Sequence, residues 1–363
     1  MSFALSYCPD GLERLQRLRL LYEQQPQDRI FARMQTPARA LSAFAETHEE
    51  GYCPPPDLRR RVAFWDELLR EQAAVLDDSI PSAYLSELDQ GLYGGIVGGK
   101  VQFMTSGDSG WVSSMVWPIL NDWSEFENLT IDRDGRWYRF YLEELDLFRE
   151  ASQGKFGVSH FILINGLNFV FELFGATRTY MELIDNPERV SEAIDFAFRL
   201  NVDVQRTFFE RIPLLEGSTC SNTGGWLPGR IVSESVDPFH MTSVDYFEKW
   251  GREPAERILT TFDGGVLHIH ANGRHLLEAV SSLRGLKALY AADDRGYPSA
   301  FSILRDVKSR TGGLPLVVGV EYPQFAEALE RHDLCGGVLY NVGGVPDADT
   351  ANRCMERVRG YRC

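Results

Sequence analysis

The chain has 363 residues, which is enough for one large α/β barrel or for two ordinary domains. Hydrophobic residues make up 44% and charged residues 25%, the proportions of a soluble globular enzyme without a membrane-spanning run. The net charge of −15 argues against a nucleic-acid surface, because phosphate binding needs an excess of Lys and Arg.

Residues 1–60 are polar, helical in pattern, and end near a run of three prolines. We interpret them as an amino-terminal helical cap and residues 61–363 as the main domain. An apolar run at residues 73–78 ends in two aspartates and predicts the first strand. Residues 91–131 are rich in glycine, aromatic residues and turn signals, which predicts a β-hairpin insertion over the mouth of the main domain.

From about residue 135 the sequence alternates regularly between helical and strand patterns. The later predicted strands are residues 158–163, 213–218, 266–270, 286–291, 314–320 and 337–342. This alternation favours parallel pairing with right-handed crossovers. Seven strands are clear, and an eighth is sought at 111–120 or near Gly157. An open doubly wound sheet is the alternative, although no Gly-x-Gly-x-x-Gly follows a strand.

Two histidines, His268 and His270, lie at the end of the predicted strand 266–270. Alternate residues of a strand face the same side, so both imidazoles converge at the carboxyl end, where barrel enzymes place their chemistry. Neutral imidazole is a common zinc or iron ligand. The sequence therefore favours a metal site here. Substrate binding, acid–base work, or structural hydrogen bonds to carbonyl groups are the alternatives.

A catalytic zinc usually takes three protein ligands and keeps one open position. The third ligand must therefore come from another strand end. Glu321 is our first candidate, with Cys220, Asp293 and Asp294 as alternatives.

Paired aspartates follow two predicted strands, at 77–78 and at 293–294. Neighbouring residues point opposite ways, so we expect one carboxylate of each pair to face the pocket. Asp78 and Asp293 are candidates for general acid or base work. A helix N-cap explains Asp294 at least as well.

Amide and aromatic side chains lie near the same end of the predicted sheet. Asn165 and Asn168 follow the strand 158–163, where an amide can hold a substrate carbonyl or carboxylate, and ordinary turn chemistry is the alternative. An aromatic cluster lies in and around the hairpin insertion, where it would wall an apolar pocket or pack the hairpin core. Its members are Tyr84, Tyr93, Trp111, Trp117 and Trp123.

The six cysteines are scattered and form no Cys-x-x-Cys pair. The first residues lack the basic start and long apolar core of a signal peptide. These features favour reduced thiols and a cytoplasmic location.

Several of these segments resemble the uroporphyrinogen decarboxylase-like superfamily, over roughly residues 60–363. The matching segments are residues 77–81, 91–95, 165–169, 183–187, 268–273 and 339–344. The resemblance implies a (β/α)8 TIM barrel, here with an amino-terminal helical extension and a β-hairpin excursion. It also implies one of two chemistries. One is cofactor-free decarboxylation of uroporphyrinogen, and the other is corrinoid methyl transfer with zinc held by a His-x-Cys pair and a distant Cys.

The chain departs from both branches of the superfamily. Residues 34–39 match the arginine-rich loop of the decarboxylases poorly, and an acidic chain would repel an octa-anionic porphyrinogen. His270 takes the place of the methyltransferase cysteine, which still suits zinc, and Gly344 takes the place of the distant cysteine. The resemblance therefore points to an altered methyltransferase site with zinc at His268, His270 and Glu321.

We therefore predict a methyltransferase that moves a methyl group between a small substrate and a corrinoid protein. The chain has no corrinoid-binding Asp-x-His-x-x-Gly segment, so the corrinoid would arrive on that partner, and a homodimer stays open. The alternatives are a metal-free decarboxylase or lyase using Asp78 and His268, and a non-enzymatic corrinoid or tetrapyrrole binder. The residues expected to contact substrate are Tyr84, Tyr93, Trp117, Asn165, Asn168, Asn272 and Asn341.

Overall fold

A six-stranded parallel sheet carries the histidine pair. The computed structural model describes residues 5–160 and 162–363. The strands of this sheet pair in the order β1-β13-β12-β11-β10-β9, and every pairing is parallel. They are β1 (Ile30–Met34), β9 (Ile231–Ser235), β10 (Gly264–Ile269), β11 (Leu286–Ala291), β12 (Leu316–Glu321) and β13 (Val338–Gly343).

A second sheet has four strands in the order β3-β6-β7-β8. They are β3 (Ser82–Tyr84), β6 (Gly157–His160), β7 (Ser218–Ser221) and β8 (Gly225–Pro228), and only the β7–β8 pairing is antiparallel. Segments next to the second sheet bind the edges of the first: Leu163 N, after β6, donates to Ser233 O of β9 (2.8 Å), and Asp78 N, before β3, donates to Ala32 O of β1 (2.9 Å). The fold is therefore mixed α/β with a parallel sheet, as predicted, but no closed barrel ladder is found among the described strands.

A three-stranded antiparallel sheet stands apart from the parallel strands. It consists of β2 (Gly51–Cys53), β4 (Val101–Ser106) and β5 (Trp111–Val116), and β4 and β5 form a hairpin. The segment 111–120, where the sequence left room for a parallel strand, thus contributes an antiparallel one.

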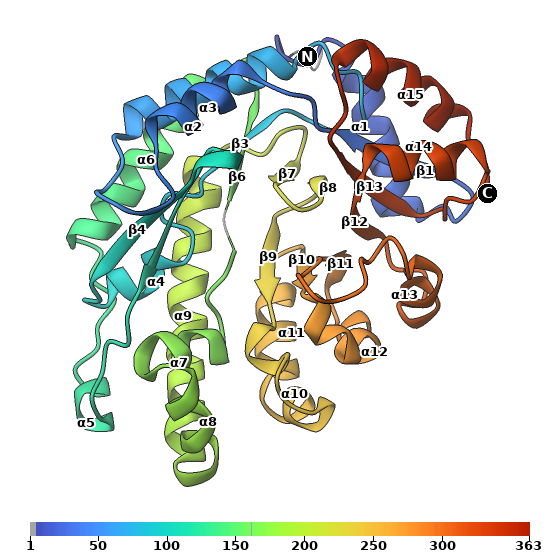
Figure 1. Cartoon of the computed structure of the whole chain (residues 1–363). Helices are drawn as coiled ribbons and strands as arrows, with labels where there is room; N and C mark the ends of the chain where they lie inside the picture. The colour runs from blue at the N-terminus through green and yellow to red at the C-terminus, as the bar shows by residue number, and fades with distance from the viewer. Residues whose placement is uncertain (1–4, 161) are drawn as a thin grey trace.

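Helices surround the two parallel sheets (Figure 1). Those before β9 are α1 (Gly11–Arg19), α2 (Arg39–Thr47), α3 (Leu58–Gln72), α4 (Gly91–Ile96), α5 (Trp123–Phe126), α6 (Arg136–Ser152), α7 (Leu167–Phe174), α8 (Ala176–Asp185) and α9 (Pro187–Arg211). Those after it are α10 (Val244–Trp250), α11 (Arg252–Thr261), α12 (Leu277–Ser281), α13 (Leu304–Arg310), α14 (Tyr322–Glu330) and α15 (Ala348–Gly360). No helix in the described ranges is long and apolar enough to span a bilayer.

Strand alternation divides the six-stranded sheet into two faces. One face packs into the main core beneath the helices, and the other carries a smaller apolar cluster that includes Phe31, Val266 and Leu339. We call the face with the smaller cluster the inner face. Because alternate residues of a strand share a face, the polar residues two positions after these three apolar residues also lie on the inner face. These residues are Arg33, His268 and Asn341.

Two predicted strands were misplaced, and one strand in the amino-terminal segment was not predicted. Residues 73–78 form turns, and the strand follows at β3, because Asp77 and Asp78 are held by arginines of α1. Residues 1–60 include the strand β1, whose five-residue apolar run is too short for its period to be read. Residues 213–217 precede the strand β7.

The strand β9 was not predicted at all. Its sequence Ile-Val-Ser-Glu-Ser carries three polar residues, although all five are buried. Its polar composition therefore hid a buried strand.

Candidate metal centre

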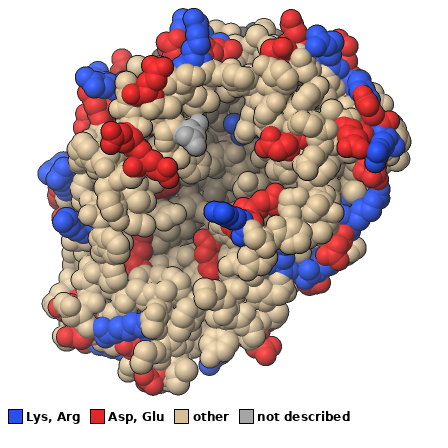
Figure 2. Space-filling model, in the orientation of Figure 1, with Lys and Arg blue, Asp and Glu red and all other residues tan. Residues whose placement is uncertain are grey.

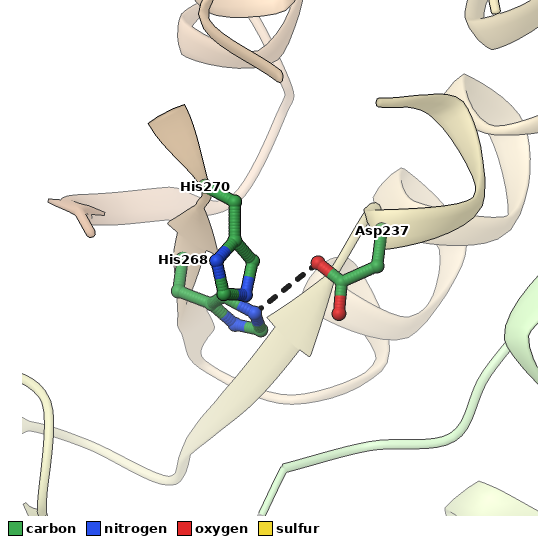
Figure 3. Close-up of side chains that lie close together, drawn as sticks. All are labelled: Asp237, His268 and His270. Carbon is green, nitrogen blue, oxygen red and sulfur yellow. Dashed lines mark ion pairs between the residues drawn. The ribbon is translucent and has the colours of Figure 1, made fainter. Parts of the chain in front are cut away.

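Asp237, His268 and His270 bring their ligand atoms together at the carboxyl ends of two neighbouring strands (Figure 3). Both histidines come from the end of β10, and Asp237 opens a short 3-10 turn, Asp237–Phe239, just after β9. β9 and β10 pair in parallel, with Ser235 opposite His268. One ligand atom from each of the three side chains lies within 4.8 Å of the other two. The parallel register therefore assembles a carboxylate and two imidazoles.

The spacing of these atoms suits one metal ion. Asp237 Oδ1 lies 3.2 Å from Nε2 of His268. Two ligands at zinc bond lengths and a tetrahedral angle would lie about 3.3 Å apart. The ring centroids of His268 and His270 are 5.1 Å apart and their planes are nearly perpendicular at 82°. One carboxylate and two imidazoles are also an ordinary donor set for catalytic zinc, so these residues fit the ion.

Charge favours the ionised carboxylate at this position. Burial acts to raise the pKa of Asp237, but the hydrogen bond with His268 and the charges of the nearby histidines outweigh it and lower the pKa to about 2. Asp237 is therefore an anion throughout the neutral range.

A third imidazole, His240, packs beside the pair. Its side chain is 4% exposed, and its ring centroid lies 5.6 Å from that of His270. Burial, together with the neighbouring histidines, lowers the pKa of His240 to about 4, so its ring is neutral at physiological pH. The ring packs on Gly273, where an added Cβ would lie 2.2 Å from His240 Cδ2. Gly273 is thus needed for space.

The two aspartates at 293–294 have different hydrogen-bond partners. Asp294 Oδ1 lies 2.9 Å from His270 Nδ1, and its Oδ2 accepts a hydrogen bond from Ala271 N (2.6 Å). Asp293 accepts instead from Arg274 Nη2 (2.9 Å) and Ala300 N (2.6 Å). Asp294, for which the sequence left both a metal ligand and a helix cap open, is therefore the member of the pair that contacts a histidine.

The other predicted metal ligands lie outside the triad. Glu321 is exposed at the end of β12, and its Oε2 lies 2.9 Å from the position that a Cβ on Gly344 would take. Cys220 is buried in the inner apolar cluster, where burial raises the pKa of its thiol to about 12. A neutral thiol in an apolar setting is a poor ligand.

Asp78 is tied to the amino-terminal helix. It is fully buried, and its oxygens accept hydrogen bonds from Arg17 and from Ala32 N. Within the described part of the chain it makes no hydrogen bond or ion pair with His268.

The predicted amide residues lie in three different settings. Asn165 donates to Glu234 Oε2 (3.0 Å) and to Pro254 O (3.2 Å), and Asn168 donates to Ser235 O (3.2 Å), so both brace the end of β9. Asn272 is exposed. Asn341 lies on the inner face, and its buried side-chain oxygen has no hydrogen-bond partner among the described residues.

The predicted aromatic residues do not line one shared pocket. The buried ones pack against neighbouring side chains. Tyr84 is buried with its ring centroid 5.1 Å from that of Trp111. Tyr93 is buried and accepts a hydrogen bond from Gln205. Trp117 is exposed and donates to the side chain of Gln102.

Arg33 is an inner-face residue that the sequence analysis missed. It lines a cavity of about 440 Å³ together with Gln35, Ser82 and Trp111. Burial lowers the pKa of its guanidinium, and nearby Asp77 and Tyr290 offset that only in part. Among the described residues it makes no ion pair, and it donates one hydrogen bond, to Asn222 O (3.3 Å). Its signal was a lone charge inside the apolar run of β1.

Asp237 and His240 were missed because the strand before them was missed. An Asp-Pro step directly after a strand would have indicated a turn carrying a carboxylate. The face of the molecule drawn in Figure 2 is hollowed near its centre, with acidic side chains at several points around the hollow.

The chain is similar in structure to a methyltransferase from Methanosarcina mazei. The TM-score is 0.62 with 15% sequence identity, and the match covers 95% of this chain and 97% of that chain. At this identity the likeness shows the fold alone. No protein-family model matches the sequence, and no curated protein matches it.

Proposed function

We propose that this protein is a metal-dependent methyltransferase whose metal is held by Asp237, His268 and His270. The convergence of these three side chains at the ends of β9 and β10 carries the proposal. In this proposal the third ligand is Asp237, in place of Glu321, which the sequence analysis named. The methyltransferase with a similar fold supports the reaction class.

We also infer that the two parallel sheets are arcs of one (β/α)8 barrel. The strands β1, β3, β6, β9, β10, β11, β12 and β13 alternate with helices along the chain, and a backbone hydrogen bond lies at each of the two gaps between the sheets. In such a barrel the chemistry lies at the carboxyl ends of the strands, where the triad is found.

Each residue of the centre has a separate task in this proposal. A bound divalent metal would act as a Lewis acid on a substrate thiol, oxygen or nitrogen. The ionised Asp237 and the neutral imidazoles of His268 and His270 supply its ligands. The buried, neutral ring of His240 closes one side of the centre against water.

We expect the substrate to carry an anionic group that binds Arg33. Arg33 lies on the same inner face as His268 and makes no ion pair among the described residues, so its partly buried charge is compensated only in part, by nearby Asp77 and Tyr290. A carboxylate or sulfonate in the cavity that Arg33 lines would complete this compensation through paired hydrogen bonds.

The methyl group would be exchanged with a corrinoid carried by a partner protein. Support comes from the segment 268–273, which resembles the methyltransferase branch of the superfamily and supplies two of the three ligands. The acid–base alternative that pairs Asp78 with His268 gains no support, because Asp78 is occupied by Arg17 and Ala32.

Metal analysis tests the centre directly. Protein purified without added zinc should carry about one metal ion per chain, and Asp237→Ala, His268→Ala and His270→Ala should each remove it. Asp293→Asn serves as the matched control and should retain it. Equal, near-zero metal in the wild type and in all variants would refute the metal-dependent proposal.

Methyl transfer is tested with methylcobalamin and small thiols, followed by visible absorbance. Arg33→Met should raise KM for a thiol that carries a carboxylate or sulfonate and leave KM for a neutral thiol unchanged. Equal effects on both thiols would contradict the anionic substrate, and no demethylation with any thiol would contradict the reaction.

A further inference from the structure

His270 is held from outside the metal centre by one carboxylate. Its Nδ1 lies 2.9 Å from Asp294 Oδ1, while Asp294 Oδ2 accepts from Ala271 N at 2.6 Å. Asp294 therefore binds a ring nitrogen and the backbone of the next residue at once. The other edge of the His270 ring points toward His268 and Asp237 (Figure 3).

This contact fixes the direction of the hydrogen bond. Asp294 is partly exposed and accepts the backbone N–H of Ala271, so its carboxylate is ionised at neutral pH, far above the ordinary Asp pKa of about 3.9. An ionised carboxylate can only accept hydrogen bonds. In a neutral ring the proton must then lie on Nδ1, which leaves the lone pair on Nε2.

We propose that Asp294 is a positioning residue that holds His270 in its Nδ1–H tautomer, with Nε2 free to bind the metal. The inference rests on the proposed function for the identity of the metal centre, but not for the tautomer. A carboxylate behind a ligating histidine sets ring orientation and basicity, and its loss typically costs 10-fold to 100-fold in metal affinity.

An asparagine cannot take over both contacts. The two donors, His270 Nδ1 and Ala271 N, each need an acceptor, and an amide offers only one oxygen. Whichever donor faces the amide nitrogen loses its bond. If the oxygen stays with Ala271 N, the amide N–H drives His270 to the opposite tautomer, with its proton on Nε2.

The adjacent aspartate is a matched control. Asp293 is similarly exposed, at 38% against 32% for the side chain of Asp294, and its oxygen accepts from Arg274 and Ala300 N. It contacts neither histidine of the pair among the described residues. Asp293→Asn thus changes the same charge without touching His270.

Ring nitrogen shifts report the tautomer in metal-free protein. Protein with 15N-labelled histidine is measured by long-range 1H–15N correlation, at a pH well above the ordinary imidazole pKa of about 6.5. The His270 signals are assigned by their loss in His270→Gln. We expect the Nδ1–H pattern in the wild type and in Asp293→Asn, and a shift toward Nε2–H in Asp294→Asn and Asp294→Ala.

An Nε2–H pattern in the wild type, or an unchanged pattern in both Asp294 variants, would overturn the proposal. If one Asp294 variant fails to fold, the other and the wild-type spectrum still decide the matter.

Zinc titration of the same proteins then tests the link to the metal. We expect Asp294→Asn to weaken zinc binding by 10-fold to 100-fold and Asp293→Asn to leave it within about twofold. A tautomer shift without weaker binding would overturn the positioning role. If the wild type binds no zinc but shows the Asp294-dependent tautomer, the metal-dependent function fails and the tautomer assignment stands.

Discussion

The chain contains two Asp-Asp pairs that the structure uses in opposite ways. Asp77 and Asp78 are buried and bind Arg14 and Arg17 of α1, so they fasten the amino-terminal helix to the sheet. Asp293 and Asp294 are partly exposed beside the metal centre, and Asp294 binds His270. The same dipeptide therefore serves stability in one region and positioning in the other. What differs is the surroundings: buried arginines in one case and a half-exposed imidazole in the other.

We expect the largest effect when one carboxylate is removed from each pair and the losses of unfolding free energy are compared. Asp78→Ala would leave Arg17 unpaired in a buried site, which typically costs about 3–5 kcal/mol of unfolding free energy. Asp294→Ala would break half-exposed contacts and should cost about 1 kcal/mol. Urea unfolding of both variants measures the difference. Equal losses would mean that burial does not distinguish the pairs.

Zinc should stabilise the folded protein only by binding at the candidate metal centre beside Asp293 and Asp294. Zinc at 100 times its dissociation constant would add about 2.7 kcal/mol to the unfolding free energy of the wild type. Asp237→Ala should abolish that gain, whereas Asp293→Asn should keep it. Thermal unfolding with and without zinc measures the effect. An equal gain in Asp237→Ala would place the binding site elsewhere.

The space beside the histidines offers a finer test. An alanine at Gly273 would press on His240, and such overpacking usually costs about 1–3 kcal/mol. Gly319→Ala is the matched control, because a Cβ there meets no atom within 4 Å. We expect Gly273→Ala alone to lose stability and to weaken zinc binding. A stable Gly273→Ala with wild-type zinc affinity would show that His240 can move without consequence.

Acidification should give the smallest effect. The pKa of Asp294 is lowered in the folded protein, so its stabilising contribution is present above the ordinary Asp value of about 3.9 and is lost as pH falls through the lower, folded-state pKa. The stability difference between wild type and Asp294→Asn, below about 1 kcal/mol, should shrink over that range. Urea unfolding across acidic pH measures it. A difference that grows as the pH falls below about 3.9 would contradict the assignment.

The sequence alone determined the alternation of strands and helices after residue 135 and the shared face of His268 and His270. Both follow from local periodicity, because alternate residues of a strand point the same way whatever the strand pairs with. It also placed the 293–294 pair at the same end of the sheet and named Asp293 as a catalytic candidate, whereas Asp294 is the member that contacts His270.

Only the tertiary structure decided the third candidate ligand, the contacts of Asp78 and the position of Arg33. Asp237 lies 31 residues before His268 and reaches it only because β9 pairs in parallel with β10. Asp78 and Arg17 are likewise distant in sequence and meet across the sheet edge. Such contacts depend on which strands become neighbours, and a single sequence does not encode strand order in any local pattern. For that reason the histidine pair could be predicted from the sequence, while its contact with Asp237 could not.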